Sequence, residues 1–155
     1  MVIKDKLNWF GKVFELVWSD LDTFDGLEPK KMRQIYGVCF YNDKIVVGKG
    51  SRRGKWNLIG GTIEEAETSQ EALKREIQEE SNMRLLSWRP IGNQEVVPPK
   101  GESFHQLRTV CLVEPIGKFE KDPAGSVIEI KMINPKNFKN ISTGERSEKE
   151  LSLVH

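Results

Sequence analysis

The alternation of apolar and polar positions predicts a chain made mainly of β-strands. Apolar or alternating runs of strand length, separated by polar and glycine-containing turns, indicate strands rather than helices. Asn42-Asp43 separates two such runs by two residues that favour a tight hairpin. The expected strands are 13–18, 34–41, 44–48, 85–91, 94–97, 106–114 and 127–134.

One segment has the signals of an α-helix at both ends. Thr68 followed three residues later by Glu71 is a capping box, which predicts that a helix begins at residue 69. The interior is rich in Ala, Leu, Glu, Lys, Arg and Gln, which favour helices. Asn82 tolerates the left-handed conformation common at helix ends. We therefore expect a helix over 69–81.

The order of these elements favours an α/β (α+β) fold, in which helices cover a sheet. A second, short helix is expected at 145–154. The 155 residues suit one domain, 1–155, which is large enough to bury a core without disulfide or metal. Residues 1–33 are expected to be an N-terminal extension of this domain with one strand.

Composition narrows the class of protein. With 37% hydrophobic and 30% charged residues and a formal charge of +1, the chain is neither disordered nor strongly basic, so we expect no stable nucleic-acid partner. No apolar run is long enough for a membrane helix or a signal peptide, so we expect no membrane partner and a cytoplasmic location. Cys39 and Cys111 lie in apolar runs and are expected to be buried free thiols.

Aromatic residues give the N-terminal extension an apolar face. It can be core, which we favour, or a dimer surface, or part of a substrate pocket, and we expect a monomer or a homodimer. The residues concerned are Trp9, Phe10, Phe14 and Trp18.

Charge is distributed unevenly along the chain. Residues 64–80 contain seven Glu against Lys74 and Arg75, a net charge of −5, so the remaining residues together carry +6. A basic segment lies just upstream, with cations at Lys49, Arg52, Arg53 and Lys55. A basic loop that leads into an acidic helix suits an anionic ligand held through a cation, although a charge run is also typical of a solvated surface.

Three carboxylates share one side of the expected helix. At 100° per residue, Glu76, Glu79 and Glu80 fall within a sector of about 100°, beside an apolar stripe of Leu73 and Ile77. Like charges at these spacings destabilise a helix unless they are solvated or offset by a cation. Carboxylate oxygens are the ligands that Mg²⁺ and Mn²⁺ prefer, so a solvated face and a metal site both remain open.

The spacing between residues 61 and 83 resembles a known motif. Gly61 is followed after five residues by Glu67, and after seven more by Arg75-Glu76-Ile77-Gln78-Glu79-Glu80-Ser81-Asn82-Met83. This resembles the Nudix box, Gly-x5-Glu-x7-Arg-Glu-U-x-Glu-Glu-x-Gly-U, where U is aliphatic. Only Asn82 departs, in place of the late Gly. Because Asn also tolerates a left-handed backbone, we expect the departure to have little effect on catalysis.

The resemblance implies a fold, a cofactor and a reaction. It implies an α/β/α sandwich with a mixed β-sheet, and hydrolysis of a phosphoanhydride bond in a nucleoside diphosphate linked to another group. By motif position, Mg²⁺ or Mn²⁺ would be held by the backbone carbonyl of Gly60 or Gly61 and by three catalytic carboxylates, Glu76, Glu79 and Glu80. Arg75 would act with them and form a structural ion pair with Glu67.

The substrate and the general base are left open. Arg52, Arg53 and Lys55 can bind phosphates or belong to a solvated loop, and Trp56 can pack beside the box or stack on a base. Pro98 is a hint of an ADP-ribose hydrolase, but a non-standard or oxidised nucleoside triphosphate suits the chain as well. The candidate bases are Glu79, Glu102, Glu120 and Glu129, with His105 behind them.

Two other functions compete with hydrolysis. A Nudix-like module that binds a nucleotide without cleaving it is one, and an isoprenoid diphosphate isomerase of the same fold is the other. Because all three box carboxylates are present and no His and Cys metal constellation is evident, hydrolysis is favoured.

Overall fold

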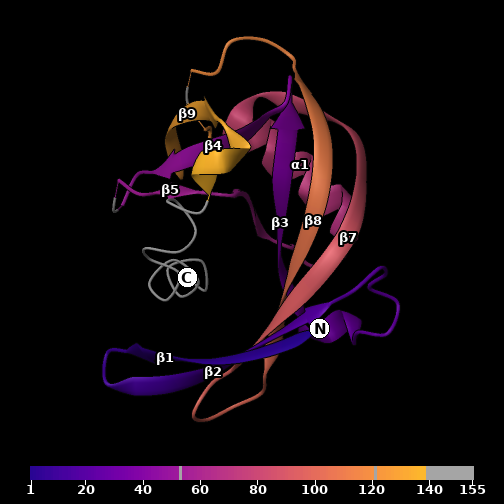
Figure 1. Cartoon of the computed structure of the whole chain (residues 1–155), viewed down its shortest axis with the longest axis vertical. Helices are drawn as coiled ribbons and strands as arrows, with labels where there is room; N and C mark the ends of the chain where they lie inside the picture. The colour runs from indigo at the N-terminus through magenta and orange to yellow at the C-terminus, as the bar shows by residue number, and fades with distance from the viewer. Residues whose placement is uncertain (53, 121, 139–155) are drawn as a thin grey trace.

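In the computed structural model, which describes residues 1–52, 54–120 and 122–138, a curved mixed sheet carries one α-helix (Figure 1). The described strands lie in the order β1-β2-β7-β8-β3-β4-β5, with β6 beside β3 and β9 beside β4. The strands are β1 Val2–Trp9, β2 Lys12–Asp20, β3 Met32–Tyr41, β4 Lys44–Gly50, β5 Trp56–Asn57, β6 Ile59–Thr62, β7 Met83–Val97, β8 Phe104–Pro115 and β9 Val127–Ile133, and the helix is α1 Ser69–Ser81.

Strand β3 is the centre of the sheet. It pairs in parallel with β8, and antiparallel with β4 near its end and with β6 near its start. The pairing with β6 sets Gly61 opposite Ile35 and Gly60 opposite Tyr36. A short glycine-containing strand therefore lies between the centre of the sheet and the helix that follows it.

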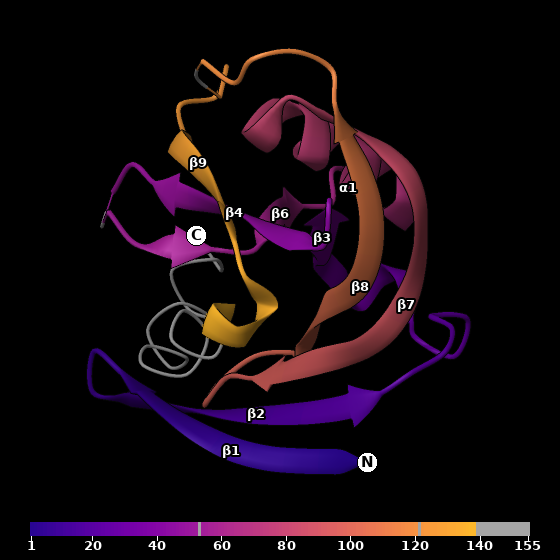
Figure 2. The same ribbon diagram turned by 45° about the horizontal axis from the view of Figure 1, so that its top comes forward.

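The helix α1 has the predicted bounds. Thr68 accepts a hydrogen bond from the backbone N–H of Glu71 and the reciprocal bond is present, so the capping box is confirmed. Asn82 ends the helix in the left-handed conformation, with φ 52° and ψ 41°. Leu73 and Ile77 are fully buried against the sheet, as the helical periodicity predicts. The helix covers one face near β6, β7 and β3 (Figure 2).

The N-terminal segment forms a hairpin rather than a single strand. Strand β1 was not predicted, and β2 pairs with β7 and extends the sheet along its edge (Figure 2). Leu7, Phe14 and Leu16 pack with apolar side chains of β7 and β8, so the core role expected for Phe14 is confirmed. The same expectation is wrong for Phe10, which lies in the hairpin turn with 82% of its surface exposed.

The predicted fold class is confirmed, and several strand boundaries change. The two strands expected at 85–91 and 94–97 are one strand, β7, whose register shifts near Leu85 and Pro90 interrupt the alternation that marks a strand. Strands β5 and β6 were not predicted, because Gly60 and Gly61 indicate a loop. The helix expected at 145–154 lies outside the described residues.

The structure also shows where the two cysteines lie and how apolar the described helices are. Cys39 and Cys111 are both buried free thiols, as predicted. Among the described residues, no helix combines the length and the apolar character needed to cross a membrane.

Candidate active site

The acidic side of α1 faces the glycines of β6. Glu80 is only 8% exposed, and its Oε1 accepts a hydrogen bond of 2.9 Å from the backbone N–H of Gly60. Gly60 has φ +153°, and a Cβ atom there would collide with the backbone of Ile35 and Tyr36. Only glycine can occupy this position, so the tight approach of β6 to β3 places the N–H that holds Glu80.

Gly61 is constrained by a second carboxylate. A Cβ atom at this position would lie 2.7 Å from the carboxyl carbon of Glu76. Any larger residue would push Glu76 away from the strand. The two consecutive glycines thus let Glu76 and Glu80, one turn apart on α1, approach the backbone of β6.

Arg75 connects the helix to the loop before it. Its Nε and Nη2 donate to the two carboxylate oxygens of Glu67 at 2.8 and 3.0 Å, and Nη2 also donates to the carbonyl oxygen of Thr62 at 2.9 Å. Nη1 donates to Glu76 at 2.9 Å and to Glu79 at 3.3 Å. The bonds with Glu67 raise the pKa of Arg75 and lower the pKa of Glu67. One guanidinium therefore organises three carboxylates of this segment.

Burial and mutual repulsion perturb the carboxylates. Burial, together with the charges of Glu76, Asp122 and Glu79, raises the pKa of Glu80 to about 8, although the bond from Gly60 opposes this shift. Burial also raises the pKa of Glu76, against the effect of Arg75. A buried group of like charges is a place where a cation would be stabilised.

Asp122 is a member of this group that the sequence did not reveal. It lies in the loop between β8 and β9, is 1% exposed, and is near enough for its charge to raise the pKa of both Glu76 and Glu80. Its Oδ1 accepts a hydrogen bond of 2.8 Å from the backbone N–H of Ala124, an Asx turn. In the sequence, Asp122-Pro123 has only the signature of a turn.

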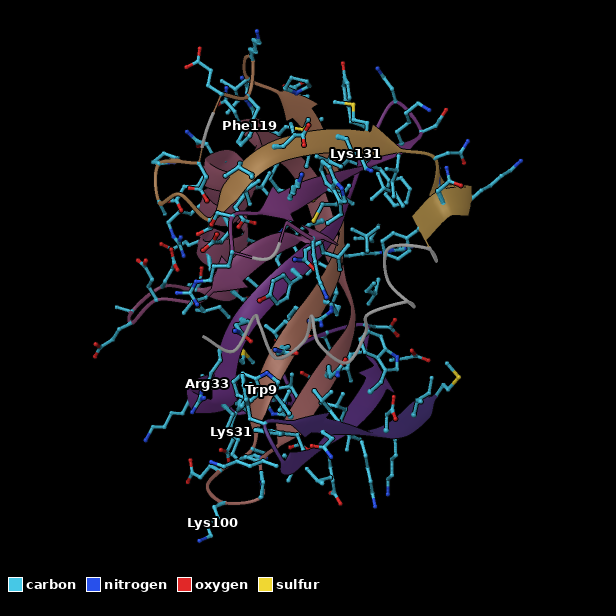
Figure 3. All side chains as sticks on the ribbon, turned by 90° about the vertical axis from the view of Figure 1, so that its left-hand side faces the viewer. Trp9, Lys31, Arg33, Lys100, Phe119 and Lys131 are labelled. Carbon is cyan, nitrogen blue, oxygen red and sulfur yellow. The ribbon has the colours of Figure 1, made fainter. Side chains whose placement is uncertain are left out.

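A pocket of about 640 Å³ is lined by one carboxylate of this group, Glu79, whereas Glu76, Glu80 and Asp122 are not among its lining residues. It lies between the outer side of α1 and the loop that joins β8 to β9, whose Phe119 is labelled in Figure 3. Its volume is typical of small-molecule sites. The lining residues are Glu71, Lys74, Arg75, Gln78, Glu79, Asn82, Lys118, Phe119, Glu120 and Pro123.

Comparison with known proteins identifies the family. The model of the NUDIX domain matches residues 31–152, most of the chain. The chain belongs to the NUDIX domain family. This membership confirms the resemblance of the box and the enzyme class expected from it, a Nudix pyrophosphohydrolase. A search of curated proteins finds no match.

Solved structures share the Nudix fold. A mutant of the Bacillus subtilis pyrophosphohydrolase BsRppH is 17% identical with a TM-score of 0.68, over 97% of this chain and 96% of its own. A Nudix hydrolase from Nitrosomonas europaea is 17% identical with a TM-score of 0.58, over 80% and 86%. A MutT structure from a study of Aliivibrio salmonicida and Vibrio cholerae is 16% identical with a TM-score of 0.56, over 79% and 95%.

The Nudix box carboxylates have the right chemistry for a hard divalent cation, but their side chains do not form a ready cage. In the described part of the chain no three His, Cys, Asp or Glu side chains are arranged to hold a metal ion. Arg75 draws Glu76 and Glu79 toward itself, while Gly60 holds Glu80. Burial nevertheless raises the pKa of Glu76 and of Glu80, so a cation bound beside them would stabilise their charged forms.

Of the basic loop before the Nudix box, the described cations Lys49, Arg52 and Lys55 are not among the residues that line the pocket. Arg52 is exposed in the turn between β4 and β5, whose tip points away from α1 (Figure 1). Lys55 is half-buried beyond this turn, and Arg53 lies outside the described residues. Trp56 packs against an apolar cluster, and the Lys131 ammonium, labelled in Figure 3, lies 4.2 Å from its ring centroid.

The candidate bases fall into two groups. Glu79 and Glu120 both line the pocket. Glu102 lies in the loop between β7 and β8, at the opposite end of the molecule from α1 (Figure 1), and Glu129 is exposed on β9 opposite Lys49. His105, the reserve candidate, is buried and hydrogen-bonded to Asn93 at 2.9 Å.

Proposed function

We propose that this protein is a divalent-cation-dependent pyrophosphohydrolase that cleaves a phosphoanhydride bond in a nucleotide. The observation that carries the proposal is the placement of the Nudix-box residues Glu76 and Glu80 directly against the backbone of Gly61 and Gly60 in β6. Glu79, the third carboxylate of the Nudix box, lines a pocket of small-molecule size together with Arg75. The names of similar structures, pyrophosphohydrolase and UDP-X diphosphatase among them, support the same reaction.

In this proposal Glu76, Glu79 and Glu80 hold Mg²⁺ or Mn²⁺, with the carbonyl oxygen of Gly61 as a further ligand. Glu76 and Glu79 would turn from Arg75 to do so, and Arg75 would keep its bonds to Glu67. A bound divalent ion supplies positive charge to the phosphates and lowers the pKa of a water ligand.

The protein must also supply a general base for the attacking water. Hydrolysis adds water across the bridge between two phosphorus atoms: a P–O bond forms to the attacking water, and the bridging P–O bond breaks. A carboxylate must accept the proton of that water. Of the candidates, Glu79 and Glu120 are favoured because both line the pocket, whereas Glu102 lies at the far end of the sheet.

The substrate is proposed as a nucleoside diphosphate linked to another group, such as ADP-ribose, or a non-standard or oxidised nucleoside triphosphate. The deciding experiment measures phosphate and pyrophosphate release from a panel of both kinds of nucleotide, with Mg²⁺, with Mn²⁺ and with EDTA. Release that requires the cation is the expected result. A protein that binds nucleotides but releases neither product under any condition would instead be a binding module.

A further inference from the structure

Asn82 makes a contact that the family's usual glycine cannot make. Its Nδ2 donates a hydrogen bond of 3.1 Å to the carbonyl oxygen of Lys118, at the start of the loop between β8 and β9. A second bond, 3.0 Å from the backbone N–H of Ile116 to the carbonyl oxygen of Asn82, needs no side chain. The end of α1 and this loop are thus joined by one bond that any residue permits and one that requires the amide.

The segment held by this amide forms one side of the pocket. Lys118, Phe119 and Glu120 line it from the loop, and Glu79 with Arg75 lines it from α1. Asn82 lies between the two sides and lines the pocket itself. If residues 116–120 moved away from α1, the pocket would therefore open beside Glu79.

The far end of the loop is anchored independently. The backbone N–H of Asp122 donates to Val127 at 3.3 Å, and Gly125 and Ala124 donate to the backbone and side-chain oxygens of Asp122 at 2.8 Å each. Loss of the Asn82 amide would leave these bonds in place. It would loosen residues 116–120 without displacing Asp122 from the acidic group.

We propose that Asn82 is a positioning residue that holds residues 116–120 against α1 and so shapes the pocket in which the substrate binds. This inference rests on the proposed hydrolase function. It assigns the amide a role in substrate binding, because the residues it restrains line the pocket, while the carboxylates of α1 and Asp122 stay where they are. Of the two favoured bases, Glu79 on α1 is the one that this proposal leaves in place. The replacement of the late Gly of the box is then a gain of a contact, and not only a tolerated exchange.

The test compares Asn82→Gly and Asn82→Asp with the wild-type full-length chain. Gly keeps the left-handed backbone, and Asp keeps the side-chain size, but neither can donate to the Lys118 carbonyl. We expect faster hydrogen–deuterium exchange in residues 116–120, and a KM about fivefold higher for the best nucleotide substrate, with kcat within about twofold of wild type. The matched control is Asn42→Gly, at another exposed left-handed Asn, which should change none of these.

Three results would overturn the proposal. Unchanged exchange in residues 116–120 would show that the amide does not hold the loop. Faster exchange with an unchanged KM would show that the loop does not contact the substrate. A lower kcat at constant KM would move the effect to the chemical step.

Failure of the proposed function would look different. Wild-type protein would then release no product from any nucleotide with Mg²⁺. In that case the dissociation constant for the tightest-binding nucleotide is measured in place of KM. We expect both Asn82 variants to bind that nucleotide about fivefold more weakly than the wild type. Equal binding by variants and wild type would contradict the proposal.

Discussion

At the scale of single residues, Glu80 is the carboxyl group of the site whose ionisation is disfavoured most clearly, because its pKa is raised. It is buried, its pKa is raised to about 8 by burial and by neighbouring carboxylates, and the backbone N–H of Gly60 donates a hydrogen bond to it. Ionisation of this group in the folded, metal-free protein is therefore unfavourable. A cation or a proton is needed to relieve it.

This environment predicts a pH dependence of stability without metal. Below about pH 4.5 Glu80 is protonated in both states, whereas between pH 5 and 8 the unfolded chain loses this proton more readily, so the free energy of unfolding falls as pH rises. Glu80→Gln does not titrate. Urea unfolding in EDTA should show the variant gaining roughly 2–4 kcal/mol relative to wild type from pH 5 to pH 8. Parallel pH profiles would contradict the raised pKa.

The carboxylates also predict a loss of turnover. Glu79→Gln and Glu80→Gln each remove a charge proposed to bind the cation, so each should lower kcat at limiting Mg²⁺ by about tenfold or more while the protein stays folded. Glu114→Gln is the control, since Glu114 pairs with Arg84 on an exposed part of β8. Near wild-type rates in either site variant would remove that residue from the set of ligands.

At the scale of elements, α1 depends on a bidentate contact with the loop before it. Arg75 and Glu67 are partly buried. Their two bonds join residues eight positions apart, and the bond from Arg75 to Thr62 joins residues thirteen positions apart. Such planar pairs are stronger than exposed ion pairs. The cap at Thr68 therefore fixes the N-terminal end of the helix, and Arg75 ties the middle of the helix to the preceding loop.

Arg75→Lys should show how much this geometry contributes. Lys keeps the charge but cannot bind Glu67 through two parallel N–H donors, so the free energy of unfolding should fall by about 1 kcal/mol or more. The matched change is Arg84→Lys, which affects an exposed pair with Glu114 and should cost little. Urea unfolding of both variants gives the comparison. Equal losses would mean that the bidentate pair adds nothing beyond a surface ion pair.

At the scale of the whole molecule, the acidic group joins segments that are distant in the sequence. Glu76 and Glu80 come from α1, Gly60 from β6 and Asp122 from the β8–β9 loop. A divalent ion bound among them would bind the folded chain and not the unfolded one. Binding should therefore stabilise the entire fold.

The melting temperature should accordingly rise with Mg²⁺ or Mn²⁺. At one hundred times the dissociation constant the gain is about 2.7 kcal/mol. NaCl of matched ionic strength should give a smaller rise, because it only screens the repulsion. The shift should shrink in the double variant Glu76→Gln, Glu80→Gln. An equal shift in NaCl, or a full shift in the double variant, would leave an acidic surface without a metal site.

The sequence by itself determined the elements whose signals are local. The helix bounds follow from Thr68, Glu71 and Asn82, since a capping box and a left-handed end act within a few residues. The spacing from Gly61 to Met83 was enough to predict the family and, through the resemblance to it, the ion pair between Arg75 and Glu67. In each case the deciding interaction lies within one helix and its flanking turns.

Only the tertiary structure decided the rest. Asp122 acts on the pKa of Glu80 from forty-two positions away, and the pocket forms where the loop after β8 meets α1. No local pattern encodes either arrangement. Strand β6 was not predicted because its glycines indicate a loop. These glycines are part of a strand because β6 pairs with β3. Arg52, a candidate phosphate-binding residue, is not among the residues that line the pocket. The sequence shows its charge, but its position relative to the pocket depends on how the chain folds.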